Sequence, residues 1–215
     1  IEYFKALWTE ENEDGSFTTS LQVLSTEILA SHEVLVQVLY SSLNYKDALS
    51  ASGNKGVTRN YPHTPGVDAC GLVDSSESSD YSKGDEVIVT GNDLGMNTSG
   101  GFQEYIRVPS GWVVPKPAHL SSKEAMVYGT AGFTAALSLY KMEKIGQTPE
   151  MGPILVTGAT GGVGSMAVGI LAKAGYEVIA STGKKDADAH LKKLGASRIV
   201  DRSFANDESG KPLLR

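Results

Sequence analysis

The first half of the chain has the pattern of hydrophobic and polar positions that is typical of β-strands. Short runs of valine, leucine and isoleucine, such as residues 34–38 and 86–89, alternate with polar segments. Residues 83–85, Lys-Gly-Asp, supply the residue types that tight turns require. We therefore expect a mostly β-structured region, with a polar surface loop at residues 73–85.

The pattern becomes helical where Ser121 and Glu124 have the spacing of a capping box ahead of an alanine-rich segment. From residue 154 onward, strand, glycine-rich turn and amphipathic helix are followed by strand, helix and strand. This order predicts half of a doubly wound nucleotide-binding sheet, which has about six strands when complete. We expect an α/β chain with domains at 1–120 and 121–215 that lacks the second half of this sheet.

The composition narrows the class of protein. Of the 215 residues, 40% are hydrophobic and 20% are charged, as in soluble globular proteins. The net charge of −6 argues against nucleic-acid binding, which requires clustered surplus lysine and arginine. The single cysteine, Cys70, excludes an internal disulfide, and no apolar run approaches the roughly 20 residues of a membrane span. We expect a cytoplasmic protein with small-molecule partners and with neither nucleic acid nor membrane as a partner.

The glycine-rich turn follows the apolar residues 154–156 and precedes the amphipathic helix. Its spacing, G-x-x-G-x-x-G with one further glycine, departs from the usual dinucleotide fingerprint, but the strand before it and the helix after it match that fingerprint's context. Backbone N–H groups at the start of such a helix stabilise a pyrophosphate. A turn without a ligand is the alternative. The predicted cofactor-binding residues here are Gly158, Thr160, Gly161, Gly162, Val163 and Gly164.

The residues after the next strand indicate which dinucleotide binds. NAD-binding proteins usually carry an acidic residue there, whereas this chain has Thr182, Gly183 and Lys184. A hydroxyl and an ammonium group suit the 2′-phosphate of NADPH, and Arg198 adds charge from the following strand in this interpretation. Alternatively, the lysines only begin the next helix on a solvated face, which holds above all for Lys185.

Four further stretches, read together with VTGATGGVG, resemble one family. They are SSLNYKDALSASG (41–53), YPHTPGVDACG (61–71), GGFQEYIRVP (100–109) and YGTAGFTAALSL (128–139). The chain closely resembles the medium-chain dehydrogenase/reductase superfamily, in its zinc-free quinone oxidoreductase branch and the YhdH/YhfP type that includes acrylyl-CoA reductases. The resemblance implies a GroES-like, β-rich catalytic domain ahead of a Rossmann domain, and a C-terminal return that this chain lacks.

Two departures from the zinc-dependent members of that superfamily predict a protein without zinc. Those members carry a catalytic cysteine where Asn44 stands and a G-H-E-x-x-G motif where residues 66–71 read GVDACG, and Val67 has no metal-ligating atom. We interpret Cys70 as a buried apolar residue. The histidines, expected on the surface or in loops, are His32, His63, His119 and His190.

Without a metal, hydrogen-bond donors must stabilise the negative charge that develops on the acceptor. The resemblance places Asn44 and Tyr45 beside the nicotinamide, with Tyr45 as a donor or ring contact and Asn44 as a polar contact. Alternatively, these residues simply begin a helix. Thr130 is expected to donate to the nicotinamide or its ribose, and Asp47 to orient the segment rather than to titrate.

We therefore predict an NADPH-dependent, zinc-independent oxidoreductase that transfers hydride to a quinone or an activated C=C bond, and that forms a homodimer at full length. Reduction of acryloyl-CoA or another enoyl thioester is the alternative acceptor chemistry. A non-catalytic nucleotide-sensing or RNA-binding protein is the alternative from another class, and the negative net charge counts against its RNA-binding form.

Overall fold

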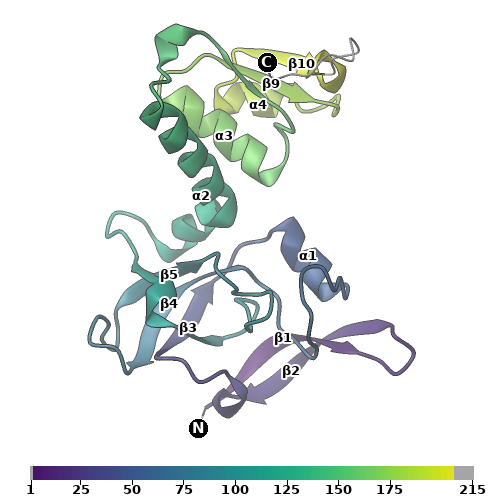
Figure 1. Cartoon of the computed structure of the whole chain (residues 1–215), viewed down its shortest axis with the longest axis vertical. Coiled ribbons are helices and arrows are strands. Elements are labelled where there is room, and N and C mark those ends of the chain that lie inside the picture. The colour runs from purple at the N-terminus through teal and green to yellow at the C-terminus, as the bar shows by residue number, and fades with distance from the viewer. Residues whose placement is uncertain (1, 206–215) are drawn as a thin grey trace. The chain divides into compact units, whose positions relative to one another are not determined.

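The computed structural model describes residues 2–205 and shows two compact units, Ile1–Thr130 and Ala131–Arg215 (Figure 1). Each unit has its own sheet and its own hydrophobic core. The fold class is the predicted one, with β-structure first and a parallel α/β arrangement second. Among residues 2–205, no helix combines the length and the apolar character that a membrane span requires.

The first unit is built on a five-stranded antiparallel sheet with the strand order β6-β3-β4-β5-β7. A separate antiparallel pair, β1 with β2, and the short helix α1 complete it. The strands and helix are β1 (Tyr3–Glu11), β2 (Phe17–Ser25), β3 (Val34–Tyr40), α1 (Tyr45–Ala51), β4 (Asp68–Ser76), β5 (Glu86–Thr90), β6 (Tyr105–Val108) and β7 (Val113–Pro115).

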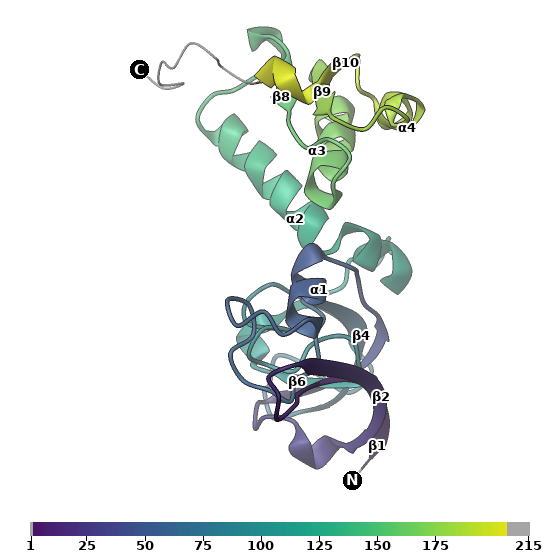
Figure 2. The same ribbon diagram turned by 90° about the vertical axis from the view of Figure 1, so that its right-hand side faces the viewer.

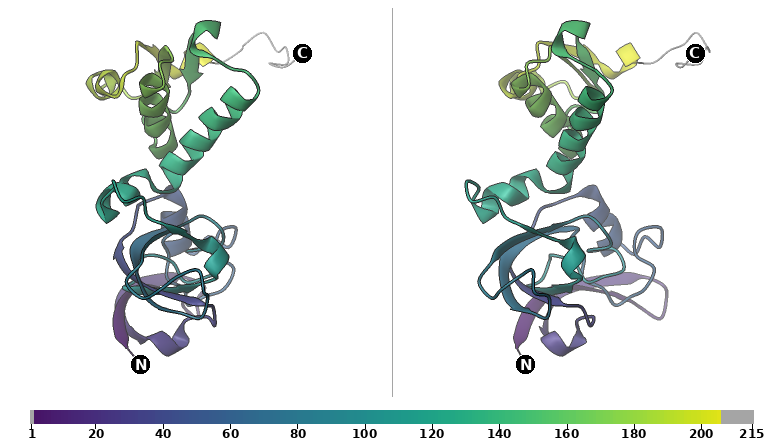
Figure 3. Two further views of the ribbon diagram at one scale, coloured as in Figure 1. Left: turned by 90° about the vertical axis from the view of Figure 1, so that its left-hand side faces the viewer. Right: turned by 60° about the vertical axis from the view of Figure 1, so that its left-hand side comes forward.

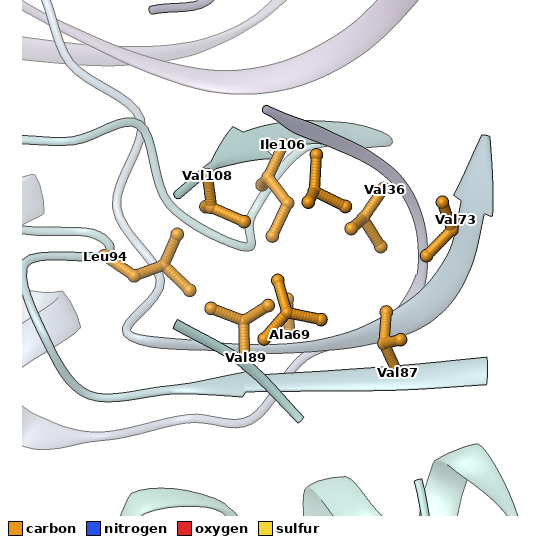
Figure 4. Packing of buried hydrophobic residues seen from close by; sticks show 10 residues of the cluster. Val36, Ala69, Val73, Val87, Val89, Leu94, Ile106 and Val108 are labelled. Atoms are coloured by element: carbon orange, nitrogen blue, oxygen red, sulfur yellow. The ribbon is translucent and has the colours of Figure 1, made fainter. Parts of the chain in front are cut away.

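The core of the first unit lies on one face of this sheet. Figure 4 shows side chains from β3, β4, β5 and β6 pointing toward one another, with Leu94 from a loop closing the cluster. Val34, Leu35 and Val36 are all buried, because Val34 and Val36 enter this cluster while Leu35 packs with Phe4 on the other side. Burial on both faces explains why β3 reads as an apolar run rather than as a strict alternation.

The polar loop after β4 is shorter than the sequence indicated. β4 continues to Ser76, with Val73 fully buried, so only the later part of residues 73–85 is a connection. The polar side chains of Ser75 and Ser76 suggest a loop, but their backbones pair with Leu35 and Val34 in the sheet. The start of the loop is therefore predicted too early.

Helix α2 (Ser122–Lys144) starts with the predicted capping box, in which the Ser121 N–H donates to the Glu124 carboxylate (2.8 Å) and the Glu124 N–H to Ser121 Oγ (3.2 Å). The helix breaks at Gly129, which has φ 46° and ψ −152°. Its first segment packs Ala125 and Met126 against the first unit's β-structure. The two compact units therefore divide after Thr130, inside α2, whereas the predicted domain boundary lies after residue 120.

The second unit contains a three-stranded parallel sheet with the order β10-β9-β8. Helices α3 and α4 contact each other and the sheet, as Figures 2 and 3 show, and their apolar faces form the core with residues such as Val168, Val178 and Leu191. The elements are β8 (Ile154–Val156), α3 (Gly162–Lys173), β9 (Val178–Thr182), α4 (Asp188–Leu194) and β10 (Arg198–Asp201).

Candidate functional site

The turn between β8 and α3 forms the first part of the candidate site. Gly161 is the N-cap of α3, and it has no side chain that competes for the N–H groups of the first helical turn. Thr160 Oγ1 lies 3.3 Å from Thr182 Oγ1, so the turn and the end of β9 are neighbours. Val163 is on the first turn of α3 and is 43% exposed.

Gly164 allows α3 to approach this turn closely. A Cβ atom at this position would lie 2.2 Å from the Gly158 carbonyl oxygen, far inside van der Waals contact. A glycine at this position therefore lets the first turn of α3 pack directly against the backbone of the turn.

A hollow of about 290 Å³ lies at the carboxyl end of β9. Thr182 is at the end of the strand, and its Oγ1 accepts a hydrogen bond from the Lys184 N–H (3.1 Å), which orders the loop. The lining contains hydroxyl and cationic side chains and no carboxylate: Gly158, Thr160, Ser181, Thr182, Gly183, Lys184 and Arg202.

Arg202, which the sequence analysis missed, is the second cation of this hollow. It follows Asp201, which pairs with Thr182, so it leaves the sheet at the carboxyl end. Arg198 pairs with Ile179 near the opposite end of the sheet, and its guanidinium lies 5.2 Å from the Phe204 ring centroid. Arg198, the predicted cation, starts the strand, whereas Arg202 follows it, and the length of β10 is not evident from its residues alone.

The second part of the candidate site is a cavity of about 60 Å³ in the first unit. It brings together Asn44, Thr130 and a loop that follows β5. The lining residues are Asn44, Lys46, Val67, Gly91, Asn92, Leu94, Met96 and Thr130. Lys46 lies in the stretch 41–53 that carries the family resemblance, but nothing in the sequence marks it or the loop residues as lining a cavity, so only the fold identifies them.

Asp68 organises the polar side of this cavity from beneath. Its buried carboxylate accepts hydrogen bonds from the Thr130 N–H (2.9 Å), the Thr130 hydroxyl (2.7 Å), the Asn44 amide (3.0 Å) and the Ser42 hydroxyl. The Asn44 amide nitrogen also donates to Ser42 Oγ (2.8 Å), so it joins the Ser42 hydroxyl and the Asp68 carboxylate in one hydrogen-bond network.

Asn44 is also the N-cap of α1, so these residues do begin a helix, and this position is compatible with a role of Asn44 at the site. Asp47 accepts hydrogen bonds from the Asn44 N–H (2.7 Å) and the Val67 N–H (2.9 Å), which fixes the start of α1 against the entry to β4. Burial raises the pKa of the Asp47 carboxyl, and the two N–H donors oppose that shift. Asp47 thus orients the segment, as expected. Tyr45 is 81% exposed and does not line the cavity.

Cys70 and His63 are both buried, the first as expected and the second against expectation. Cys70 packs with Ala125 and Met126, and burial raises the pKa of its thiol. His63 is 4% exposed because its backbone pairs with Thr9 of β1, which draws this segment into the interior. Within residues 2–205, no three His, Cys, Asp or Glu side chains gather as a metal site would require.

Comparison with known proteins relates both units to one group of enzymes. Residues 30–118 match the alcohol dehydrogenase GroES-like domain. The chain is 49% identical to YhfP of Bacillus subtilis, named as a candidate quinone oxidoreductase, over 98% of this chain and 63% of that protein. It is 44% identical to the acrylyl-CoA reductase AcuI of Ruegeria pomeroyi, over 98% of this chain and 64% of AcuI.

Solved structures agree with these sequence relationships. The structure of Bacillus subtilis YhfP with NAD bound has a TM-score of 0.95 and 47% identity, over 100% of this chain and 65% of that one. The YhdH oxidoreductase from Salmonella enterica in complex with NADP has a TM-score of 0.91 and 44% identity, over 94% of this chain and 62% of that one. The chain thus spans less than two thirds of the length of these relatives.

Proposed function

Because this chain belongs to the medium-chain dehydrogenase/reductase superfamily, in its quinone oxidoreductase and acrylyl-CoA reductase group, we propose that it is an NADPH-dependent oxidoreductase. In this proposal it transfers hydride to a quinone or to an activated C=C bond. The observation that carries the proposal is the cationic, hydroxyl-lined hollow beside the glycine turn, where Lys184 and Arg202 meet at the end of β9.

The second unit would hold the dinucleotide. The N–H groups of Gly162, Val163 and Gly164 at the start of α3 would bind the pyrophosphate, supported by the helix dipole. Thr182, Gly183, Lys184 and Arg202 would bind the 2′-phosphate, and Thr160 orders the turn beside them.

Selectivity for NADPH over NADH follows from charge. A carboxylate at the end of β9 would accept hydrogen bonds from an unmodified ribose and repel a phosphate, whereas this chain has Thr182 there. Among the relatives, the Salmonella enterica structure contains NADP and the Bacillus subtilis structure contains NAD. The two cations of the hollow favour the phosphorylated cofactor for this chain.

The first unit would hold the acceptor in the cavity that Asn44 and Thr130 line. Tyr45, which is exposed and lies outside the lining, would contact the acceptor or the nicotinamide only when these are bound. NADPH, when bound, supplies the hydride. The positions of the zinc ligands in related alcohol dehydrogenases do not fit a metal here, because Val67 is aliphatic and Asn44 offers a neutral amide in place of a thiolate. We therefore propose that the reaction proceeds without zinc.

An acryloyl-CoA-like thioester is the second candidate acceptor, because AcuI of Ruegeria pomeroyi is named an acrylyl-CoA reductase. Quinones and enoyl thioesters make the same electronic demand on the site, since both develop negative charge on a carbonyl oxygen. We also propose a cytoplasmic homodimer that binds no nucleic acid. The acidic net charge of −6 supports the absence of a nucleic-acid partner.

Steady-state assays of the whole protein test this proposal. NADPH and NADH are each offered with a benzoquinone, a cyclic enone and acryloyl-CoA. We expect oxidation of NADPH with at least one acceptor, at a kcat/KM at least tenfold above that with NADH. Equal use of the two cofactors contradicts the assignment of the 2′-phosphate site, and no turnover with any acceptor contradicts the reductase function.

A further inference from the structure

Apart from Asn44 and Thr130, two side chains in the lining of the acceptor cavity carry hydrogen-bond donors, Lys46 and Asn92. The Asn44 amide nitrogen donates to Ser42 and Asp68, and the hydroxyl of Thr130 donates to Asp68. Val67, Leu94 and the thioether of Met96 contribute no strong donor. Of the two remaining donors, only Lys46 carries a full positive charge.

The proposed reaction requires a hydrogen-bond donor at the carbonyl oxygen of the acceptor. Adding hydride to the β-carbon of an enone or enoyl thioester moves the C=C electron pair toward the carbonyl, so the carbonyl oxygen becomes an enolate oxygen. A donor placed at this oxygen stabilises the transition state more than the ground state. A quinone develops the same charge on its oxygen.

Lys46 is the cationic residue in the lining of this cavity. Its ammonium nitrogen lies 3.7 Å from the sulfur of Met96, a weak acceptor that also lines the cavity. Among residues 2–205, no carboxylate forms an ion pair with Lys46.

Two acidic side chains near Lys46 have other partners. One is next to it in the sequence, and the other is in the loop that lines the cavity. Asp47 accepts the N–H groups of Asn44 and Val67. Asp93, in the loop after β5, accepts hydrogen bonds from Asn97 (3.0 Å) and Thr98 (3.2 Å). The exposed ammonium group of Lys46 thus lies at the cavity wall and has no carboxylate partner among residues 2–205.

We propose that Lys46 is a catalytic residue that donates a hydrogen bond to the carbonyl oxygen of the acceptor, an inference that rests on the proposed reductase function. NADPH, when bound, would supply the hydride to the β-carbon and become NADP+. The C=C electron pair would then form an enolate, and the Lys46 ammonium would donate a hydrogen bond to its oxygen. The α-carbon would take a proton from water to give the saturated product, and the hydroxide so formed would be neutralised by bulk solvent.

Replacing Lys46 with methionine, which has similar length and no charge, tests this role in the whole protein. Loss of one oxyanion donor typically lowers kcat by 10²–10³. We expect Lys46→Met to lower kcat for an enone about 100-fold, while the acceptor KM and the Kd for NADPH change less than about threefold. Lys46→Arg, which keeps a donor, should recover at least tenfold of the loss. Lys123→Met, at an exposed lysine of α2, is the matched control and should stay within twofold of wild type.

Three results separate the inference from the function beneath it. If wild type is active and Lys46→Met keeps kcat within threefold, the role of Lys46 is overturned and the reductase function stands. If Lys46→Met weakens NADPH binding as much as it lowers kcat, or if Lys46→Arg is no better than Lys46→Met, the residue has a structural role and the inference is also overturned. A wild type that reduces no acceptor overturns both.

Discussion

The Asp68 carboxylate accepts both the backbone N–H and the hydroxyl of Thr130, at 2.9 and 2.7 Å, across 62 residues of sequence. Thr130 is the first residue of α2 beyond the break at Gly129. The start of the second helical segment is therefore capped by an anion from β4, where the helix dipole favours negative charge. The same carboxylate holds Asn44, so helix break and acceptor cavity share one anchor.

Asp68→Asn should lower the free energy of unfolding by about 2–3 kcal/mol, because an amide group puts donors opposite the donors of Thr130, Asn44 and Ser42. Urea denaturation measures the change. Asp80→Asn, at an exposed aspartate, is the control and should change stability by less than about 0.5 kcal/mol. Equal effects of the two variants would show that the network around Asp68 contributes little.

Gly129→Ala should be more destabilising than its backbone angle alone explains. A Cβ atom at Gly129 would lie 2.6 Å from Asp68 Oδ2, and φ is 46°. Gly146→Ala is the matched control, because Gly146 has φ 93° and no atom within 4 Å of the added carbon. We expect a loss of about 3–5 kcal/mol for the first and about 1–2 kcal/mol for the second. Similar losses of unfolding free energy in the two variants would mean that the Asp68 side chain can move away from the added carbon without an energetic penalty.

Gly164→Ala should displace α3 from the glycine turn and weaken NADPH binding, with an overpacking cost of about 1–3 kcal/mol. Gly169 lies in the same helix, with no contact closer than 4.0 Å for an added Cβ. Gly169→Ala should stabilise the protein by about 0.5–1 kcal/mol through helix propensity and leave NADPH binding unchanged. Fluorescence titration with NADPH, combined with thermal unfolding, checks both variants. Unchanged NADPH affinity in Gly164→Ala would contradict the pyrophosphate assignment.

Arg202→Ala should weaken NADPH about 10- to 100-fold, the effect of losing one or two charged hydrogen bonds. Binding of NADH, which has no 2′-phosphate, should stay within twofold. Arg198→Ala should leave both affinities within twofold, since Arg198 pairs with Ile179 near the other end of the sheet. Isothermal titration with both cofactors makes the comparison, and a larger effect at Arg198 than at Arg202 would reverse the assignment.

Acid should destabilise the protein through His63. Burial lowers the pKa of its imidazole, while the Gly95 backbone and the charge of Asp93 oppose that shift. With the folded pKa below the unfolded value near 6.5, stability is full above pH 6.5 and falls as the unfolded state takes up a proton, by at most about 1.4 kcal/mol per pH unit. His63→Gln should flatten the profile of unfolding free energy between pH 6.5 and 5. An equally steep profile in this variant would assign the acid sensitivity to other groups.

Strand and helix positions in both units could be predicted, because they depend on local periodicity and on local signals. The capping box at Ser121 and the β-α-β-α-β order after residue 154 are of this kind, and the structure has both. The break at Gly129 could not be predicted, since it depends on a carboxylate 61 residues earlier in the chain. The predicted polar loop at residues 73–85 is too long, because Ser75 and Ser76 have polar side chains although their backbones pair in the sheet.

Only the parts of the candidate site that belong to a sequence motif could be predicted. The glycine turn and the Thr182–Lys184 loop were identified from residue types at fixed spacing, whereas Arg202 required the register of β10 against β9. Asp68 lies in an apolar run, and no local signal distinguishes Lys46 from a solvated lysine. Their roles depend on which distant segments fold beside them, and this information is not local to either residue.

The Gly129 break also limits how this region can be redesigned. The missing side chain leaves room for Asp68, whose carboxylate in turn sets the rotamer of Asn44. Positions 42, 44, 68, 129 and 130 should therefore be exchanged together. This holds both when the acceptor pocket of one relative is moved into another and when a library is screened for a broader substrate range. Exchanging any of them alone would leave the others without their counterparts.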